Sequence, residues 1–148
     1  MIAGIDPGKN GAIALLYADG TLYVEDTPSL NKEINGAAIA SLLNEFTPEI
    51  AVIESVNSFG MGRQSAFNFG QGVGVFKGVL AALEIPYVEV TPAKWKRFYN
   101  LSSDKDDARA AAIRLFPSKA DLFKRKMDAD RAEAALIALW YQQAGIKR

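Results

Sequence analysis

The chain has 148 residues, of which 49% are hydrophobic, so one core of ordinary domain size can form without disulfides. It contains no cysteine and no histidine, which excludes Cys/His zinc sites, Ser–His and Cys–His nucleophile pairs, and histidine acid–base chemistry. Any catalysis must therefore use carboxylates, lysines or hydroxyls, and carboxylates select hard cations such as Mg²⁺ or Mn²⁺.

The charges are unevenly distributed along the chain, although the formal net charge is zero. Residues 1–91 carry 4 basic and 10 acidic side chains, whereas residues 92–126 carry 10 basic and 4 acidic side chains. This asymmetry indicates a basic face beside an acidic centre, which suits a polyanionic partner and bound divalent cations. The alternative is that the lysines lie on solvated helices and only improve solubility.

The chain is predicted to begin with a buried strand that ends on a carboxylate. Residues 2–5 form a short, mainly apolar run, Asp6 follows, and turn residues 7–11 lead into a second apolar strand over residues 12–17. A carboxylate on a buried strand is costly unless it meets a cation or a hydrogen-bond donor, so Asp6 is a candidate metal ligand. A solvated aspartate that opens the turn is the alternative.

A third antiparallel strand and a helix are predicted next. Residues 21–25 alternate between polar and apolar side chains, and residues 27–36 form a polar connection. Apolar side chains then recur at helical spacing over residues 39–46, which predicts an amphipathic helix that ends before Pro48.

A second apolar run also ends on a carboxylate. Residues 50–53 are continuously apolar and Glu54 follows, which is typical of a central parallel strand that returns after a helix. Because the carboxyl ends of parallel strands meet at one edge of a sheet, Asp6 and Glu54 are expected to lie close together. Two carboxylates so near to each other destabilise the fold unless a cation lies between them.

A glycine-rich loop over residues 57–65 follows Glu54 and carries Phe59, Met61 and Arg63. An exposed aromatic ring and a guanidinium at the edge of a site suit base stacking and phosphate binding. The alternative is a mobile connection in which Phe59 packs beneath its own loop.

A helix is predicted over residues 66–83, with Gly70, Gly74 and Gly78 on one stripe. Glycines weaken a helix, so the stripe is expected to allow close approach of another element. A dimer seam and packing on the sheet are the two possibilities.

The fifth strand is predicted over residues 85–90, and Thr91 and Pro92 begin a short helix in which basic and aromatic residues alternate. Its members are Lys94, Trp95, Lys96, Arg97 and Phe98. Such a helix can track a nucleic-acid backbone, although Trp95 and Phe98 could equally be core anchors.

Two more helices complete the chain. Ser103 is expected to cap a helix that runs to residue 115, whose first turn holds aspartates 104, 106 and 107 as capping groups rather than ligands. In the last helix, Asp130 and Glu133 share a face, and surrounding alanines allow that face to approach the sheet. A capping box formed by Asp130 and Glu133 is the alternative.

Taken together, these motifs resemble RuvC-type Holliday junction resolvases, the crossover junction endodeoxyribonucleases of bacteria and phages in the RNase H-like superfamily. Gly4-Ile-Asp-Pro-Gly8 resembles the family's first-strand motif, Ile53-Glu54-Ser55 its central-strand glutamate, and Asp130-Arg-Ala-Glu133-Ala its C-terminal Asp-x-x-Asp helix. Their order and separations match over nearly the whole chain. The stretch over residues 69–74 also resembles the start of the family's dimer-interface helix.

The resemblance implies a single RNase H-like nuclease domain over residues 1–148. This α/β fold has a five-stranded mixed sheet, whose first three strands are antiparallel, flanked by helices on both faces. Asp6, Glu54, Asp130 and Glu133 would bind two Mg²⁺ ions per active site, with Mn²⁺ as a substitute, for two-metal phosphodiester hydrolysis. Glu133 stands where many members have Asp, and Asp128 is a competing carboxylate.

The resemblance also implies a metal-dependent endodeoxyribonuclease that resolves four-way junctions or other branched DNA with symmetric nicks, as a homodimer. Lys105 would serve catalysis by stabilising the charge on the phosphate, a role that Lys96 could also take, and either lysine could instead simply hold the DNA backbone. Phe59 lies in the loop where family members insert an aromatic residue at the junction centre. The remaining DNA contacts would come from basic residues of the same regions, namely Arg63, Lys94, Lys96 and Arg97.

Three rival interpretations are open. A sugar-kinase or actin-like ATPase needs two such domains around its nucleotide, and this chain has room for one. A related nuclease acting on structured RNA would use the same four carboxylates, and a non-catalytic junction-binding module would lack some of them. The absence of cysteine and of a signal-peptide pattern predicts a soluble, intracellular protein. The resemblance implies the cytoplasm of a bacterial or phage-infected cell, and no membrane contact is expected.

Overall fold

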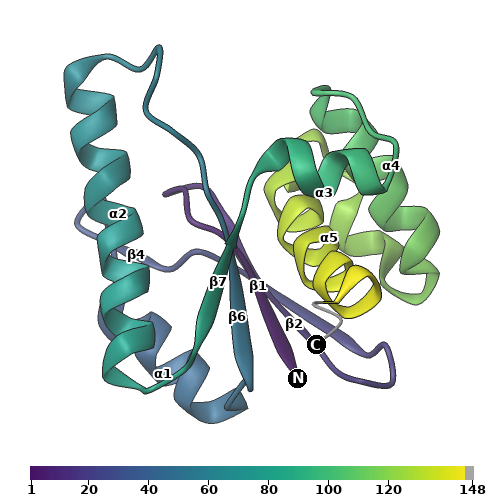
Figure 1. The fold of residues 1–148 in the computed structure, drawn as a ribbon, viewed down its shortest axis with the longest axis horizontal. Helices are drawn as coiled ribbons and strands as arrows, with labels where there is room; N and C mark the ends of the chain where they lie inside the picture. The colour runs from purple at the N-terminus through teal and green to yellow at the C-terminus, as the bar shows by residue number, and fades with distance from the viewer. Residues whose placement is uncertain (146–148) are drawn as a thin grey trace.

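The computed structural model describes residues 1–145 and contains a mixed five-stranded sheet (Figure 1). The strand order is β3-β2-β1-β6-β7, where β1 is Ile2–Asp6, β2 is Ala12–Leu16, β3 is Leu22–Asp26, β6 is Ile50–Glu54 and β7 is Tyr87–Val90. The first three strands pair antiparallel, whereas β6 runs parallel to both β1 and β7. The predicted fold class and the predicted antiparallel start of the sheet are confirmed.

Helices cover both faces of the sheet (Figure 1). One face carries α1 (Gly36–Phe46) and α2 (Arg63–Ala82), and the other carries α3 (Pro92–Phe98), α4 (Lys105–Leu115) and α5 (Ala129–Ala144). Within residues 1–145, none of these helices combines the length and the apolar character needed to span a membrane.

Each face of the sheet has its own apolar core because successive side chains of a strand point to opposite faces. On β2, Ile13 and Leu15 join the core that includes α1 and α2, whereas Ala14 and Leu16 join the core that includes α4 and α5. Every residue of β2 is buried. The continuous apolar runs in the sequence therefore reflect a sheet that is covered on both faces.

The last helix, α5, packs directly against the backbone of β1. A Cβ atom at Gly4 would lie 2.7 Å from the backbone nitrogen of Ala138 and closer still to the carbonyl oxygen of Ala134. Ala134, Ala135 and Ala138 are fully buried. Small side chains on both elements therefore hold α5 beside the strand that ends on Asp6, as the alanine-rich sequence predicts.

The start of α4 differs from the prediction. Asp104, rather than Ser103, is the N-cap, and its carboxylate accepts a hydrogen bond from the backbone nitrogen of Asp106 at 2.9 Å. The negative charge of an aspartate interacts better than a serine hydroxyl with the positive end of the helix dipole. Asp106 and Asp107 lie in the first turn, where they were predicted.

The polar connection after β3 contains a short hairpin that the sequence analysis did not predict. β4 (Ser29–Leu30) pairs antiparallel with β5 (Glu33–Ile34). Asn31 and Lys32 form the turn, with φ angles of 51° and 65° that suit a tight hairpin. Strands of two residues are too short to produce a periodic hydrophobic pattern.

The glycine stripe of α2 faces outward. Apart from the chain neighbours and the adjoining backbone of α2 itself, no described atom lies within 4 Å of a Cβ placed on Gly70, Gly74 or Gly78. Packing of this stripe on the sheet was therefore the wrong alternative. A different glycine, Gly72, is buried against β5, where a Cβ would lie 2.6 Å from Cδ1 of Ile34.

Candidate active site

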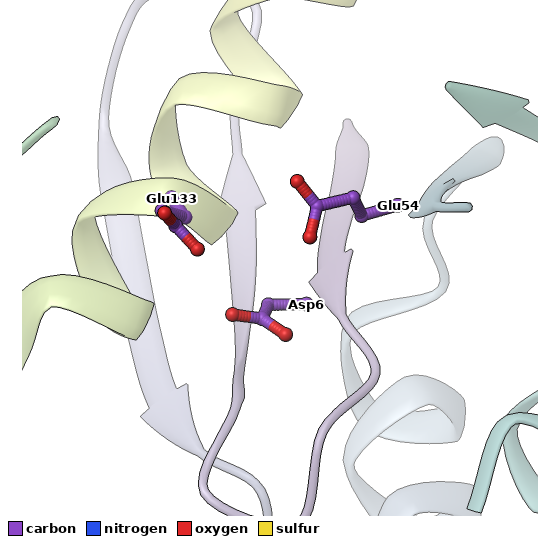
Figure 2. A group of neighbouring side chains, drawn as sticks. All are labelled: Asp6, Glu54 and Glu133. Carbon is purple, nitrogen blue, oxygen red and sulfur yellow. The ribbon is translucent and has the colours of Figure 1, made fainter. Parts of the chain in front are cut away.

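Three carboxylates that are distant in the sequence converge at one edge of the sheet (Figure 2). Asp6 ends β1 and Glu54 ends β6, and the parallel register that pairs Ile5 with Ile53 brings the two strand ends together. Glu133 reaches them from the second turn of α5. One carboxylate oxygen of each residue lies within 4.8 Å of the others.

The carboxylate cluster is electrostatically unfavourable without a positive partner. Desolvation raises the pKa of Asp6 well above its usual range, and the charges of Glu54, Asp130 and Glu133 raise it further. Desolvation also raises the pKa of Glu54, while the hydrogen bond from Trp95 opposes this rise. Such a cluster of oxygen donors fits a hard divalent cation, because cation charge offsets the repulsion between the carboxylates.

Asp130 lies in the same hollow but has a different partner. The hollow has a volume of about 260 Å³, and Asp6, Glu54, Asp130 and Glu133 all line it. Asp130 Oδ1 accepts a hydrogen bond from Lys105 Nζ at 2.5 Å. The four predicted ligands are thus brought to one site, where three carboxylates are close together and the fourth is paired with a lysine.

Two lysines border the cluster on the α3 and α4 side. Lys96 Nζ lies 3.3 Å from Glu133 Oε1, and Lys105 Nζ lies 3.6 Å from Glu133 Oε2. Desolvation lowers the pKa of Lys105, but the hydrogen bond to Asp130 and the nearby carboxylates outweigh it, so the net pKa shift is upward. Both ammonium groups therefore bring positive charge to the rim of the acidic site.

Trp95 is a site residue that the sequence analysis missed. Its side chain is completely buried, and its indole Nε1–H donates a hydrogen bond to Glu54 Oε1 at 2.9 Å. Of the two roles considered for this helix, Trp95 is a core anchor, whereas Phe98 is 48% exposed and is not. A buried tryptophan needs an acceptor for its N–H, and this requirement was the signal that could have linked Trp95 to a buried carboxylate.

The competing carboxylate, Asp128, is paired elsewhere. It is buried, and its Oδ1 lies 2.8 Å from Arg125 Nη2 and 3.6 Å from Arg131 Nη1. Asp130 lies inside α5 and is not its N-cap, so the alternative capping box with Glu133 is wrong. Glu133 instead contacts Lys96 and Lys105, because the helix face that carries it points into the site.

The predicted DNA-binding residues are spread over several surfaces. Phe59 is 95% exposed, so it does not pack beneath its own loop, and Arg63 is exposed at the first position of α2. Lys96 belongs to the carboxylate site. Lys94 lies over the ring of Trp140, 5.5 Å from its centroid, and Arg97 borders a hollow on α3 that Lys96 also lines. The structure therefore does not gather the five residues into one patch.

The chain has the same fold as several solved Holliday junction resolvases. The RuvC of Thermus thermophilus, solved in complex with a Holliday junction substrate, aligns with a TM-score of 0.71 and 19% identity over 97% of this chain and 96% of that chain. No protein-family model matches the sequence.

A viral resolvase and a yeast mitochondrial resolvase have the same architecture. The Fowlpox virus resolvase, solved with Holliday junction DNA, aligns with a TM-score of 0.60 and 15% identity over 97% of this chain and 99% of that chain. The yeast mitochondrial Holliday junction resolvase Ydc2 aligns with a TM-score of 0.57 and 16% identity over 96% of this chain and 77% of that chain. At these identities the likeness establishes the fold.

Proposed function

We propose that this protein is a structure-selective endonuclease that resolves Holliday junctions or other branched DNA by divalent-metal-dependent hydrolysis, with symmetric nicks. The observation that carries the proposal is the convergence of Asp6, Glu54 and Glu133 at one edge of a sheet with the RuvC-type fold. In this proposal, residues 1–148 act as a single nuclease domain in the cytoplasm of a bacterial or phage-infected cell.

Asp6, Glu54 and Glu133 would hold the cations, and Asp130 would join them once Lys105 turns toward the substrate. The donor set supports this assignment because it consists of desolvated carboxylates, which are ligands for Mg²⁺ and Mn²⁺. When bound, two such cations supply a water nucleophile of lowered pKa and offset the charge at the leaving oxygen.

The protein's own groups position the reactants. Trp95 fixes the orientation of Glu54 through the indole hydrogen bond. Lys96 and Lys105 place ammonium groups at the rim of the site, where they would hold the substrate phosphate and stabilise the charge that develops on it. Phe59, in the exposed loop that follows β6, would stack on a base, and Arg63, at the first position of α2, would contact phosphate.

A homodimer would suit a substrate that has approximate two-fold symmetry and needs two nicks. We place its seam on the outward glycine stripe of α2, which would let a second copy of the helix approach closely. Gly70, Gly74 and Gly78 supply the room, and Phe67, which is 67% exposed on the same helix, offers an apolar contact.

The proposal is tested by cleavage of a synthetic four-way DNA junction. With Mg²⁺, the protein should nick two opposed strands symmetrically, and with Ca²⁺ it should bind the junction without cutting it. Asp6→Asn should bind but not cut, whereas Asp19→Asn, a matched change in the exposed turn between β2 and β3, should cut normally. Cleavage of RNA hairpins but not of DNA junctions would instead favour a nuclease of structured RNA, and binding without cleavage in Mg²⁺ a junction-binding module.

A further inference from the structure

A second and larger groove adjoins the carboxylate hollow. Its volume is about 800 Å³, and it lies between the N-terminal half of α2, the β4–β5 hairpin and the turn between β1 and β2. Lys9 and Asn10 line both this groove and the carboxylate hollow. A nucleic-acid strand with a phosphate at the carboxylates can therefore continue past Lys9 into the groove.

The groove depends on the close approach of β5 to α2. Gly72 allows this approach, because a Cβ there would lie 2.6 Å from Cδ1 of Ile34 and 3.7 Å from the carbonyl oxygen of Pro7. The hairpin turn places Asn31 and Lys32 at the edge of the groove.

Half of the polar side chains that line the groove are amides. Asn68 and Gln71 stand three residues apart on α2, so they share a helix face. The amide of Asn68 is oriented by a hydrogen bond from Gln64 Nε2 to its Oδ1 at 3.0 Å. Asparagine and glutamine amides pair with the donor and acceptor atoms of base edges, above all those of adenine.

The remaining lining suits the rest of a nucleotide. Phe69 and Met61 offer an aromatic and a thioether surface on which a base can stack. Lys9 and Lys32 provide cations for phosphate, and Glu33 is the one carboxylate among the described lining residues. Amides, stacking surface and cations occur together, as the recognition of an unpaired nucleotide requires.

We propose that this groove binds an unpaired nucleobase next to the scissile phosphate and thereby determines which base sequence is cut. This inference rests on the proposed nuclease function and adds to it a site of base readout. Lys9 and Lys32 hold the strand without regard to sequence, while Asn68 and Gln71 read the edge of the base.

The test compares cleavage rates over junctions that carry each of the four bases at every position flanking the nick. The wild type should cut its preferred base about tenfold faster than the poorest one, as a good amide–base contact allows. Gln71→Ala and Asn68→Ala should reduce this spread to about twofold, whereas Asn44→Ala, a matched amide on the exposed surface of α1, should keep it. A flat profile in the wild type, or an unchanged spread in both groove variants, would overturn the proposal.

A binding measurement separates this inference from the proposed nuclease function. In Ca²⁺, 2-aminopurine next to the scissile phosphate should change its fluorescence on binding to the wild type, and the change should be smaller with Gln71→Ala. If the wild type binds and cuts junctions without any fluorescence change, the groove assignment fails while the nuclease stands. If it neither binds nor cuts junctions, both fail.

Self-association provides the last test. Sedimentation of the groove variants should match that of the wild type, because the groove is assigned to DNA. If Gln71→Ala shifts the monomer–dimer equilibrium and leaves the base preference unchanged, a second copy of the chain covers the groove and the proposal is wrong.

Discussion

At the scale of single residues, the site is organised by what each carboxylate contacts. Asp6 and Glu54 lie in a desolvated pair at adjacent strand ends, Glu133 faces two lysines, and Asp130 is bound to one of them. Asp128, only two residues from Asp130, is instead fixed by arginines outside the cluster. The direction of each side chain, and not its proximity in sequence, therefore decides its role.

Trp95→Phe should weaken metal binding while the fold is kept. The substitution removes the indole N–H that orients Glu54 but keeps an aromatic ring in the core. Loss of such an orienting hydrogen bond typically lowers metal affinity by about 10- to 100-fold. Calorimetric titration with Mn²⁺ measures this loss, and Trp140→Phe on the partly exposed end of α5 is the matched control. Equal affinity in both variants would show that the hydrogen bond is incidental.

Asp6→Asn should stabilise the metal-free protein at neutral pH. The pKa of the Asp6 carboxyl is raised in the folded state above its ordinary value of 3.8, so as the pH rises the unfolded chain loses this proton before the folded protein does. Between the unfolded-state pKa and the folded-state pKa, the free energy of unfolding therefore falls with rising pH, and the full loss is present above the folded-state pKa. In EDTA at pH 7, the Tm of the variant should exceed that of the wild type by about 2–4 °C per kcal/mol of relieved repulsion.

This gain in Tm should shrink as the pH falls to 3.8 and should vanish at lower pH, where both states hold the proton. Mn²⁺ should raise the Tm of the wild type more than that of the variant, because it binds the folded carboxylate site. Thermal unfolding with and without metal measures both effects. A lower Tm for Asp6→Asn in EDTA would contradict the repulsion argument.

At the scale of elements, the contact between β1 and α5 holds the site together. β1 carries Asp6, and α5 carries Asp130 and Glu133, so their separation determines whether the carboxylates can meet. Gly4 and the buried alanines of α5 keep the two backbones close. The outward stripe of α2 also consists of small residues, but it faces open space instead of another element of the chain.

Gly4→Ala should therefore destabilise the protein, because its Cβ would overlap the backbone of α5 near Ala134 and Ala138. Overpacking of this kind costs about 1–3 kcal/mol and occasionally more. Gly74→Ala is the matched control on α2, measured at a protein concentration at which the chain is monomeric: there the added methyl group meets open space and the helix gains about 1 kcal/mol in propensity. Urea unfolding of both variants measures the difference, and similar midpoints would show that α5 can move away without cost.

At the scale of the whole molecule, a neutral chain separates its charges into two regions. The acidic residues of the first half supply Asp6 and Glu54, while the segment over residues 92–126 carries ten basic and four acidic side chains. Lys96 and Lys105, from that basic segment, lie at the edge of the acidic site. A phosphate backbone can therefore be attracted by the surface around a centre that would repel it without cations.

Junction binding in Ca²⁺ should be strongly dependent on salt. If the basic segment contacts six or more phosphates, affinity should fall by at least about 10³-fold between 50 and 200 mM KCl, because bound counterions are released. Arg97→Ala should reduce the slope of log K against log salt by about one, while Lys77→Ala, whose ammonium is paired with Glu89 outside this segment, should not. A slope near zero would contradict a phosphate-binding surface.

The sequence by itself determined the order of the main helices and strands and the carboxylates at their ends. Apolar runs that stop at Asp6 and Glu54 predicted buried strands, and the parallel register of β1 and β6 then follows from ordinary α/β topology. These features are local, since periodicity and turn residues are encoded within a few positions of each other. Such patterns do not predict the β4–β5 hairpin, whose strands are only two residues long, or the exact N-cap residue of α4.

Only the tertiary structure decided which side chains meet. The hydrogen bond from Trp95 to Glu54 joins residues 41 positions apart, and the ion pair from Lys105 to Asp130 joins residues 25 positions apart. The outward direction of the α2 glycines and the groove beside the site likewise depend on how whole elements pack. Such contacts are made between surfaces brought together by folding, and no local pattern in the chain specifies them.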